Sequence, residues 1–92
     1  MADAGQTRLL VVDDQPTNIK LLDAILAPRG YDVRSAGSGE EALTVLGEGG
    51  IDLVLLDIVM PGLDGYEVCR RIRDDPATAF LPVVMVLSLI HI

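Results

Sequence analysis

The chain of 92 residues is long enough for one hydrophobic core, because two cores would each fall below the size at which small domains stabilise themselves. Apolar residues make up 50% of it and aromatic residues only 3%, which favours an aliphatic core of helices packed on a sheet. The formal net charge of −7 argues against nucleic-acid and membrane-surface binding and favours metal cations and cationic partners. The single cysteine, Cys69, excludes an internal disulfide. Because the N-terminus also lacks a signal-peptide pattern, the sequence predicts a cytoplasmic protein.

The first predicted elements are a buried strand and an amphipathic helix. Residues 9–12 form a continuous apolar run that ends at an acidic pair, which is typical of a parallel strand covered on both faces. Pro16 suits a first helical turn, and Gly30 marks the end of that helix. The apolar stripe predicted to face the sheet consists of Ile19, Leu22, Ile25 and Leu26.

A more exposed strand and a second helix follow. Residues 31–36 alternate between apolar and polar side chains, which predicts a strand at the edge of the sheet. Ser38 and Glu41 have the spacing of a capping box, in which each side chain accepts a hydrogen bond from an unpaired backbone N–H at the helix start. The helix is predicted to end in the glycine-rich residues 47–50.

The rest of the chain repeats this alternation. Residues 53–56 form a second continuous apolar run, predicted to be as buried as the first strand, and this run ends at Asp57. A loop rich in turn-forming residues spans 60–65, and a third helix extends from it until residues 74–76. Residues 83–86 predict a fourth strand. The predicted apolar stripe of the third helix consists of Tyr66, Val68, Cys69 and Ile72.

Strands that alternate with helices predict right-handed crossovers and a parallel sheet with helices on both faces. The predicted fold class is therefore α/β, with a doubly wound parallel sheet. In such sheets, ligands bind beyond the carboxyl ends of the strands, where the strand order reverses. If the first and third strands are neighbours, Asp13, Asp14 and Asp57 converge at that point.

These three acids predict a metal site and a nucleophile. Carboxylates crowded together repel each other unless a cation lies between them. Oxygen ligands without histidine or cysteine select Mg²⁺ or a similar ion, which also accepts a phosphoryl oxygen as a ligand. A carboxylate beside such a cation can attack phosphorus and form an aspartyl phosphate, and Asp57 is the candidate because it stands alone at its strand end. The structural alternative is that the acids only cap the following helices, and for Asp14 alone it stays open.

Two motifs in the chain resemble the receiver domain of bacterial two-component response regulators. The resemblance extends from about residue 8 to residue 86, and its specificity lies in the two motifs together with their separation. It implies a flavodoxin-like fold with strand order 2-1-3-4-5. The motifs are Val-Val-Asp-Asp-Gln-Pro at residues 11–16 and Leu-Leu-Asp-Ile-Val-Met-Pro-Gly-Leu-Asp-Gly at residues 55–65.

The resemblance implies that Asp57 accepts a phosphoryl group from the phosphohistidine of a sensor histidine kinase or phosphotransfer protein, with Mg²⁺ as cofactor. The chain would then act as a signalling switch in a phosphorelay and would not be an enzyme, beyond catalysing its own phosphorylation and dephosphorylation. An output domain would lie outside this chain. The implied metal ligands are Asp13, Asp14, Asp57 and the backbone carbonyl of Val59, and the residues implied to shape the loop are Pro61 and Gly65.

The sequence departs from the family pattern at its end. The hydroxyl residue that the family uses after the fourth strand would fall on Leu87, and Ser88 comes one position late, on the opposite face of a strand. The phosphate-binding lysine of the family has no counterpart, because the only lysine is Lys20 in the first predicted helix. The last helix, strand and helix of the family are also missing.

Two other functions remain open on the sequence. The first is a receiver-like interaction module that has lost phosphorylation, which the missing lysine leaves open if residues 87–92 are genuine. The second is a Mg²⁺-dependent phosphatase with an aspartyl nucleophile. Such enzymes carry a second acid two residues beyond the first, and Val59 in that position argues against this class.

We expect a disordered N-terminus at residues 1–7, an incomplete receiver domain at 8–86 and a non-native tail at 87–92, because Leu-Ser-Leu-Ile-His-Ile resembles translated adapter or vector sequence. Genomic DNA read beyond the codon for Val86 should therefore continue with a different sequence. A stop codon directly after the codon for Ile92 in independently determined DNA would contradict this expectation.

Overall fold

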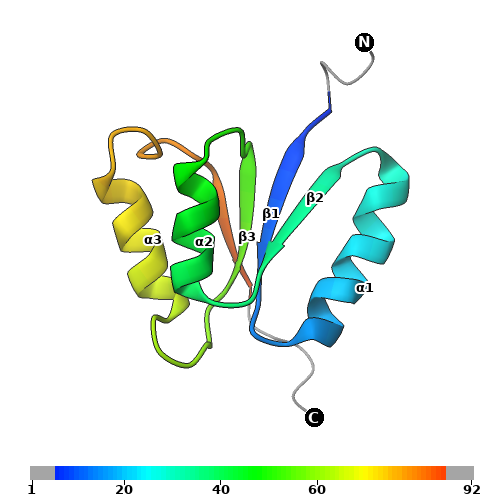
Figure 1. Ribbon diagram of the computed structural model, residues 1–92, viewed down its shortest axis with the longest axis horizontal. Helices are drawn as coiled ribbons and strands as arrows, with labels where there is room; N and C mark the ends of the chain where they lie inside the picture. Colours follow the sequence, from blue (N-terminus) through cyan, green and yellow to red (C-terminus); the bar gives the residue numbers. More distant parts are fainter. Residues whose placement is uncertain (1–5, 87–92) are drawn as a thin grey trace.

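The computed structural model describes residues 6–86, which fold around a parallel sheet of four strands (Figure 1). The strand order is β2-β1-β3-β4, which confirms the doubly wound α/β class and the first four strands of the expected order. Residues 1–5 of the expected disordered N-terminus, and the whole of the expected tail 87–92, lie outside the described residues. The strands are β1 (Arg8–Val12), β2 (Asp32–Ala36), β3 (Leu53–Asp57) and β4 (Val83–Val86).

Helices pack on both faces of this sheet, and α1 stands apart from α2 and α3 (Figure 1). The edge position of β2 agrees with the alternating polarity of its residues. Gly30 ends the first helical segment in the left-handed conformation, with a φ of 95°, after a short 3-10 turn. The helices are α1 (Pro16–Leu26), the 3-10 turn η2 (Ala27–Arg29), α2 (Gly39–Gly47) and α3 (Gly65–Asp74).

The main core lies between the sheet and the pair α2 and α3. Alternate side chains of the central strands point into it, and so do the buried faces of the two helices. The burial of these aliphatic side chains is the main stabilising contribution to the fold. The core consists of Leu10, Val12, Ala36, Ala42, Leu46, Val54, Leu56, Met60, Val68 and Ile72.

The opposite face of the sheet is covered less completely. Leu53 and Leu55 are only half-buried, so the prediction that the third strand is as buried as the first was wrong. Among the described residues α1 packs on β1 and β2, which leaves Val84 and Val86 of β4 exposed on this face. Ile25, a predicted stripe residue of α1, is 45% exposed, so that part of the prediction was wrong.

Capping side chains define the starts of α2 and α3. The Ser38 hydroxyl accepts a hydrogen bond from the Glu41 backbone N–H, at 3.1 Å, as predicted. The Glu41 carboxylate accepts from the backbone N–H of Gly37, one residue earlier than the capping box predicted. Asp64 caps α3 by accepting from the backbone N–H of Glu67 at 2.9 Å. These caps fix where both helices begin relative to the sheet.

The outer face of α3 carries ion pairs. Hydrogen bonds from Arg70 and Arg71 hold the pKa of the Glu67 carboxyl below its usual range. The pair with Glu67 also raises the pKa of Arg70. The two arginine side chains are exposed and Glu67 is partly exposed, so the network contributes little to stability. Arg73 has a different role, because it donates hydrogen bonds to the backbone carbonyls of Ala79 and Leu81 and so ties α3 to the segment before β4.

Gly65, the first residue of α3, lies directly against the end of β3. Its backbone N–H donates to the carbonyl of Ile58 at 3.1 Å. A Cβ atom at this position would collide with the backbone oxygen of Asp57 and lie 2.8 Å from Cα of Ile58. Both neighbours are backbone atoms that cannot rotate away. The close approach of helix and strand therefore gives a steric reason for glycine at this position.

Replacing Gly65 with alanine is expected to lower the free energy of unfolding by about 1–3 kcal/mol, because α3 must shift away from β3. Gly47→Ala is the matched control, since a Cβ there meets no atom within 4 Å and alanine is the better helix former. Urea unfolding followed by circular dichroism measures both variants. Equal stabilities of the two variants would contradict the packing argument.

Candidate functional site

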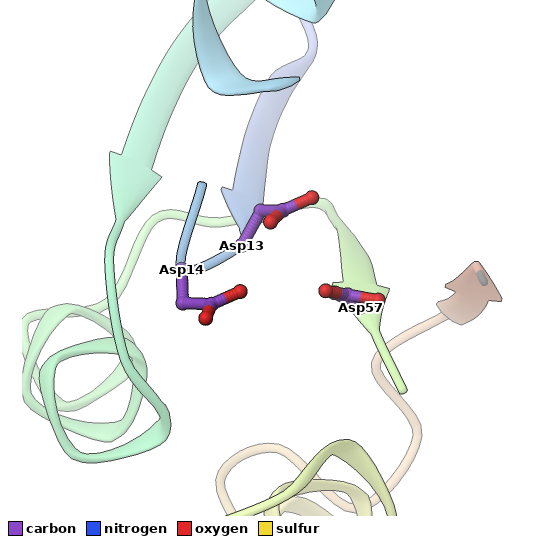
Figure 2. Close-up of side chains that lie close together, drawn as sticks. All are labelled: Asp13, Asp14 and Asp57. Carbon is purple, nitrogen blue, oxygen red and sulfur yellow. The ribbon is translucent and has the colours of Figure 1, made fainter. Parts of the chain in front are cut away.

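Three acidic side chains come together at the carboxyl end of the sheet (Figure 2). Asp13 and Asp14 directly follow β1, and Asp57 is the last residue of β3. Each offers one carboxylate oxygen, and these oxygens lie within 4.8 Å of one another. The strands are neighbours in parallel register, with Val12 beside Leu56, so their ends are level. The structure thus brings together the acids that the strand pattern predicted to converge.

The three acids differ in burial. Asp13 and Asp57 are 6% and 3% exposed, whereas Asp14 is half-buried. In Figure 2 the carboxylates of Asp14 and Asp57 point toward each other across the gap between the strand ends. Buried carboxylates require hydrogen bonds or a cation to offset the loss of water. A small pocket beside them is lined by Val11, Val12, Asp13, Leu22, Leu55, Asp57 and Val86.

The Asp13 carboxylate is held by the start of α1. One oxygen, Oδ1, accepts a hydrogen bond from the backbone N–H of Gln15 at 2.9 Å. The other, Oδ2, accepts from the side-chain amide of Asn18 at 3.0 Å. Asn18 is 7% exposed and was missed by the sequence reasoning. A signal existed, because Asn18 lies four residues before Leu22 and so shares the inward face of the helix.

Asp57 lies at the start of the loop that leads to α3. Its Oδ1 accepts a hydrogen bond from the backbone N–H of Val59 at 3.3 Å. The backbone of Ile58 continues the sheet pairing, because its N–H donates to the carbonyl of Val86 at 3.0 Å. Val59 itself is exposed. The roles implied for the Val59 carbonyl and for Pro61 stay predictions.

The donor set fits a hard divalent cation. Carboxylate oxygens are the ligands that Mg²⁺ prefers, and the group contains no histidine or cysteine that would favour zinc. Two of the acids are buried beside a third, so a cation between them would remove their mutual repulsion. Within residues 6–86, Asp13, Asp14 and Asp57 form the one group of three or more acidic, histidine or cysteine side chains that lie close enough together to hold a metal ion.

The other residues that the sequence analysis discussed are not among the three acids of this site. Lys20 lies on α1, as the sequence predicted, and is exposed, and Leu87 and Ser88 lie outside the described residues. Cys69 is half-buried and packs against the main core. Tyr66, predicted to belong to the buried stripe of α3, is 65% exposed, so that part of the prediction was wrong. In the described part of the chain, no helix is long and apolar enough to span a membrane.

Known proteins resemble this chain in sequence. It is 45% identical over 82 residues to the response regulator PleD of Caulobacter vibrioides, an alignment that covers 89% of this chain and 18% of PleD. It is 46% identical over 84 residues to a probable cyclic di-GMP phosphodiesterase of Vibrio cholerae, covering 91% of this chain and 19% of that protein. The chain thus spans less than a fifth of the length of these two relatives.

Solved structures resemble the fold. The N-terminal domain of a response regulator receiver protein from Methanoculleus marisnigri superimposes with a TM-score of 0.82 and 46% identity, covering 85% of this chain and 63% of that one. The response regulator TrrA of Thermotoga maritima, solved in complex with Mg²⁺–BeF, gives a TM-score of 0.75 and 41% identity, covering 89% and 68%. Residues 9–89 match the family described as the response regulator receiver domain. The chain belongs to the response regulator receiver domain family.

Proposed function

We propose that this chain is a phosphorylation switch in which Asp57 accepts a phosphoryl group from the phosphohistidine of a sensor histidine kinase or phosphotransfer protein. The observation that carries the proposal is the meeting of three carboxylates at the ends of β1 and β3, within 4.8 Å of one another. The family of the chain and the similarity to TrrA, solved with Mg²⁺–BeF, support it. A cytoplasmic location, where such kinases present their phosphohistidine, is part of the same proposal.

Mg²⁺ is the proposed cofactor, and it supplies positive charge against both the carboxylates and an incoming phosphoryl group. Asp13, Asp14 and Asp57 would hold the ion, together with the backbone carbonyl of Val59. Asp13 and Asp57 are buried and hydrogen-bonded at fixed positions, which suits a cation that requires nearly ideal ligand geometry. The net charge of −7 also favours cations near the protein.

The proposed transfer forms one bond and breaks one bond. A carboxylate oxygen of Asp57 attacks phosphorus, a P–O bond forms, and the P–N bond to the imidazole of the donor breaks. The electron pair of the broken bond stays on the imidazole nitrogen. Asp57 ends β3 alone, and its Oδ1 accepts a hydrogen bond from the backbone N–H of Val59. The product is an aspartyl phosphate on the protein, so the chain acts as acceptor and is proposed not to be an enzyme with an external substrate.

The phosphoryl group would act through its charge. It adds nearly two negative charges to a site that already contains three acids, and the loop between Asp57 and Gly65 would respond. This loop is tied to β4, because Ile58 donates to the carbonyl of Val86, and to α3 through Gly65. The proposed switch therefore starts where β3, β4 and α3 meet. The output domain that would respond is proposed to lie outside this chain.

A receiver-like module without phosphorylation is the second candidate. The observation in its favour is that Lys20, the only lysine of the 92 residues, lies exposed on α1 and does not correspond to the phosphate-binding lysine of the family. A phosphatase is disfavoured because Val59 stands where such an enzyme would carry its second acid.

Incubation with acetyl phosphate and Mg²⁺ tests the proposal. We expect the intact protein to gain the mass of one phosphoryl group, measured by mass spectrometry under conditions that preserve acyl phosphates. Asp57→Asn should abolish this gain, because the amide is not a nucleophile toward phosphorus. Removing Mg²⁺ with a chelator should also abolish it.

Asp64→Asn is the matched control, since it makes the same change in the same loop at an exposed residue, and asparagine caps a helix as well as aspartate. Labelling that persists in Asp57→Asn would refute the assignment of the acceptor. Continuous hydrolysis of the donor without accumulated label would indicate a phosphatase. Neither label nor hydrolysis in the folded protein would favour the non-phosphorylated module.

A further inference from the structure

We propose that Asn18 is a positioning residue for the metal site, because its side-chain amide holds the Asp13 carboxylate, one oxygen of which lies within 4.8 Å of carboxylate oxygens of Asp14 and Asp57. The inference rests on the proposed function, since it assigns a role within the proposed Mg²⁺ site. It adds a residue from a helix, α1, to a site otherwise built from the ends of two strands.

The burial of Asn18 is unusual for its helix. Asn18 is 7% exposed and is the buried residue of α1, whereas the apolar residues Leu21 and Ile25 are 51% and 45% exposed. An amphipathic helix gains most by burying its apolar side chains, and a buried amide costs free energy unless it is hydrogen-bonded. Apolar packing alone therefore does not account for an amide at this position, and the hydrogen bond to Asp13 is one interaction that offsets the cost of burying it.

The hydrogen bonds fix the Asp13 carboxylate from two sides. Gln15 donates its backbone N–H to Oδ1 at 2.9 Å, and Asn18 donates its side-chain amide to Oδ2 at 3.0 Å. The first bond is local and depends only on the turn after β1. The second depends on how α1 lies against the sheet. Because both oxygens are held, the carboxylate cannot rotate about its bond to Cβ without losing one of these bonds.

Asn18 is itself held in place. Its backbone N–H donates to the carbonyl of Gln15 at 3.0 Å in the first turn of α1, which begins at Pro16. The fixed φ of proline at the start of the helix limits the directions in which the first turn can point. The position of the helix thus fixes the amide, and the amide orients the Asp13 carboxylate.

The neutral charge of the amide matters for a cation site. Lysine or arginine in its place would donate equally well, but the positive charge would compete with the metal ion for the carboxylates. An apolar residue would fill the space but leave Oδ2 without its donor. An amide orients Asp13 and leaves its negative charge for the cation. Carboxylate ligands are commonly oriented by hydrogen-bond donors that do not touch the metal, and losing such a donor weakens metal binding.

The test measures Mg²⁺ affinity by calorimetric titration of the 92-residue chain. Asn18→Leu keeps the number and branching of the side-chain heavy atoms and removes the donor, so we expect the dissociation constant for Mg²⁺ to rise by about tenfold to a hundredfold. The matched control is Thr17→Leu, which introduces the same side chain at the neighbouring exposed position and should leave the affinity unchanged. Circular dichroism without Mg²⁺ verifies that both variants are folded.

A second measurement needs no variant. The sequence contains three side-chain amides, those of Asn18, Gln6 and Gln15, so the Asn18 resonances in a ¹⁵N spectrum are assigned among only three pairs of signals. We expect them to shift in step with Mg²⁺ binding, and those of Gln6, which is exposed before β1, to stay in place. An Asn18 amide that does not respond at saturating Mg²⁺ would overturn the inference even if Asn18→Leu fails to fold.

The two proposals fail in different ways. Equal Mg²⁺ affinities of the unmodified chain and Asn18→Leu would overturn the positioning role and leave the proposed function intact. No Mg²⁺ binding by the unmodified chain would overturn the metal site and the role of Asn18 with it. Weaker Mg²⁺ binding in Asn18→Leu together with phosphoryl labelling of Asp57 in the unmodified chain would support both.

Discussion

The parallel pairing of β1 with β3 is the interaction that creates the site. Its register sets Val12 beside Leu56, so that the residues after both strands meet at one level of the sheet edge. Carboxylates brought this close repel each other, and nothing in the acids themselves would hold them together. Burial of the aliphatic side chains of both strands against α2 and α3 stabilises the pairing and offsets this repulsion. Charge placement at the site is thus a consequence of apolar packing beneath it.

The two faces of the sheet differ in how completely helices cover them. The face that packs on α2 and α3 contains the main core, and the loop behind Asp57 closes onto it through Gly65. The other face packs on α1 at β1 and β2, and among the described residues it stays open over β4. The acids lie at the carboxyl end of the sheet, between the face covered by α2 and α3 and the less completely covered face that packs on α1. Asp13 and Asp57 are buried there, and Asp14 keeps partial contact with solvent.

The helix α1 links these observations. It covers its part of the sheet with half-buried apolar residues and contributes one buried amide, Asn18, at the end nearest the acids. The same helix starts directly after the acidic pair, so its position and the orientation of Asp13 are coupled by a few residues of chain. A movement of α1 relative to β1 would change the hydrogen bond at Oδ2 of Asp13, because the Asn18 amide links the helix to this carboxylate. The proposed metal site therefore depends on a helix as well as on the strands.

The sequence by itself determined the order and type of the strands and α-helices from β1 to β4, though not the 3-10 turn η2, because apolar periodicity and turn residues act over a few positions of chain. It also determined which acids end the two central strands, since an apolar run that stops at an acid is visible without a structure. It did not determine which predicted stripe residues become buried, and Ile25 and Tyr66 proved exposed. Nor did it identify Asn18 as the donor to Asp13. Burial and hydrogen-bond partners depend on what covers a residue from distant parts of the chain, and only the tertiary structure decides that.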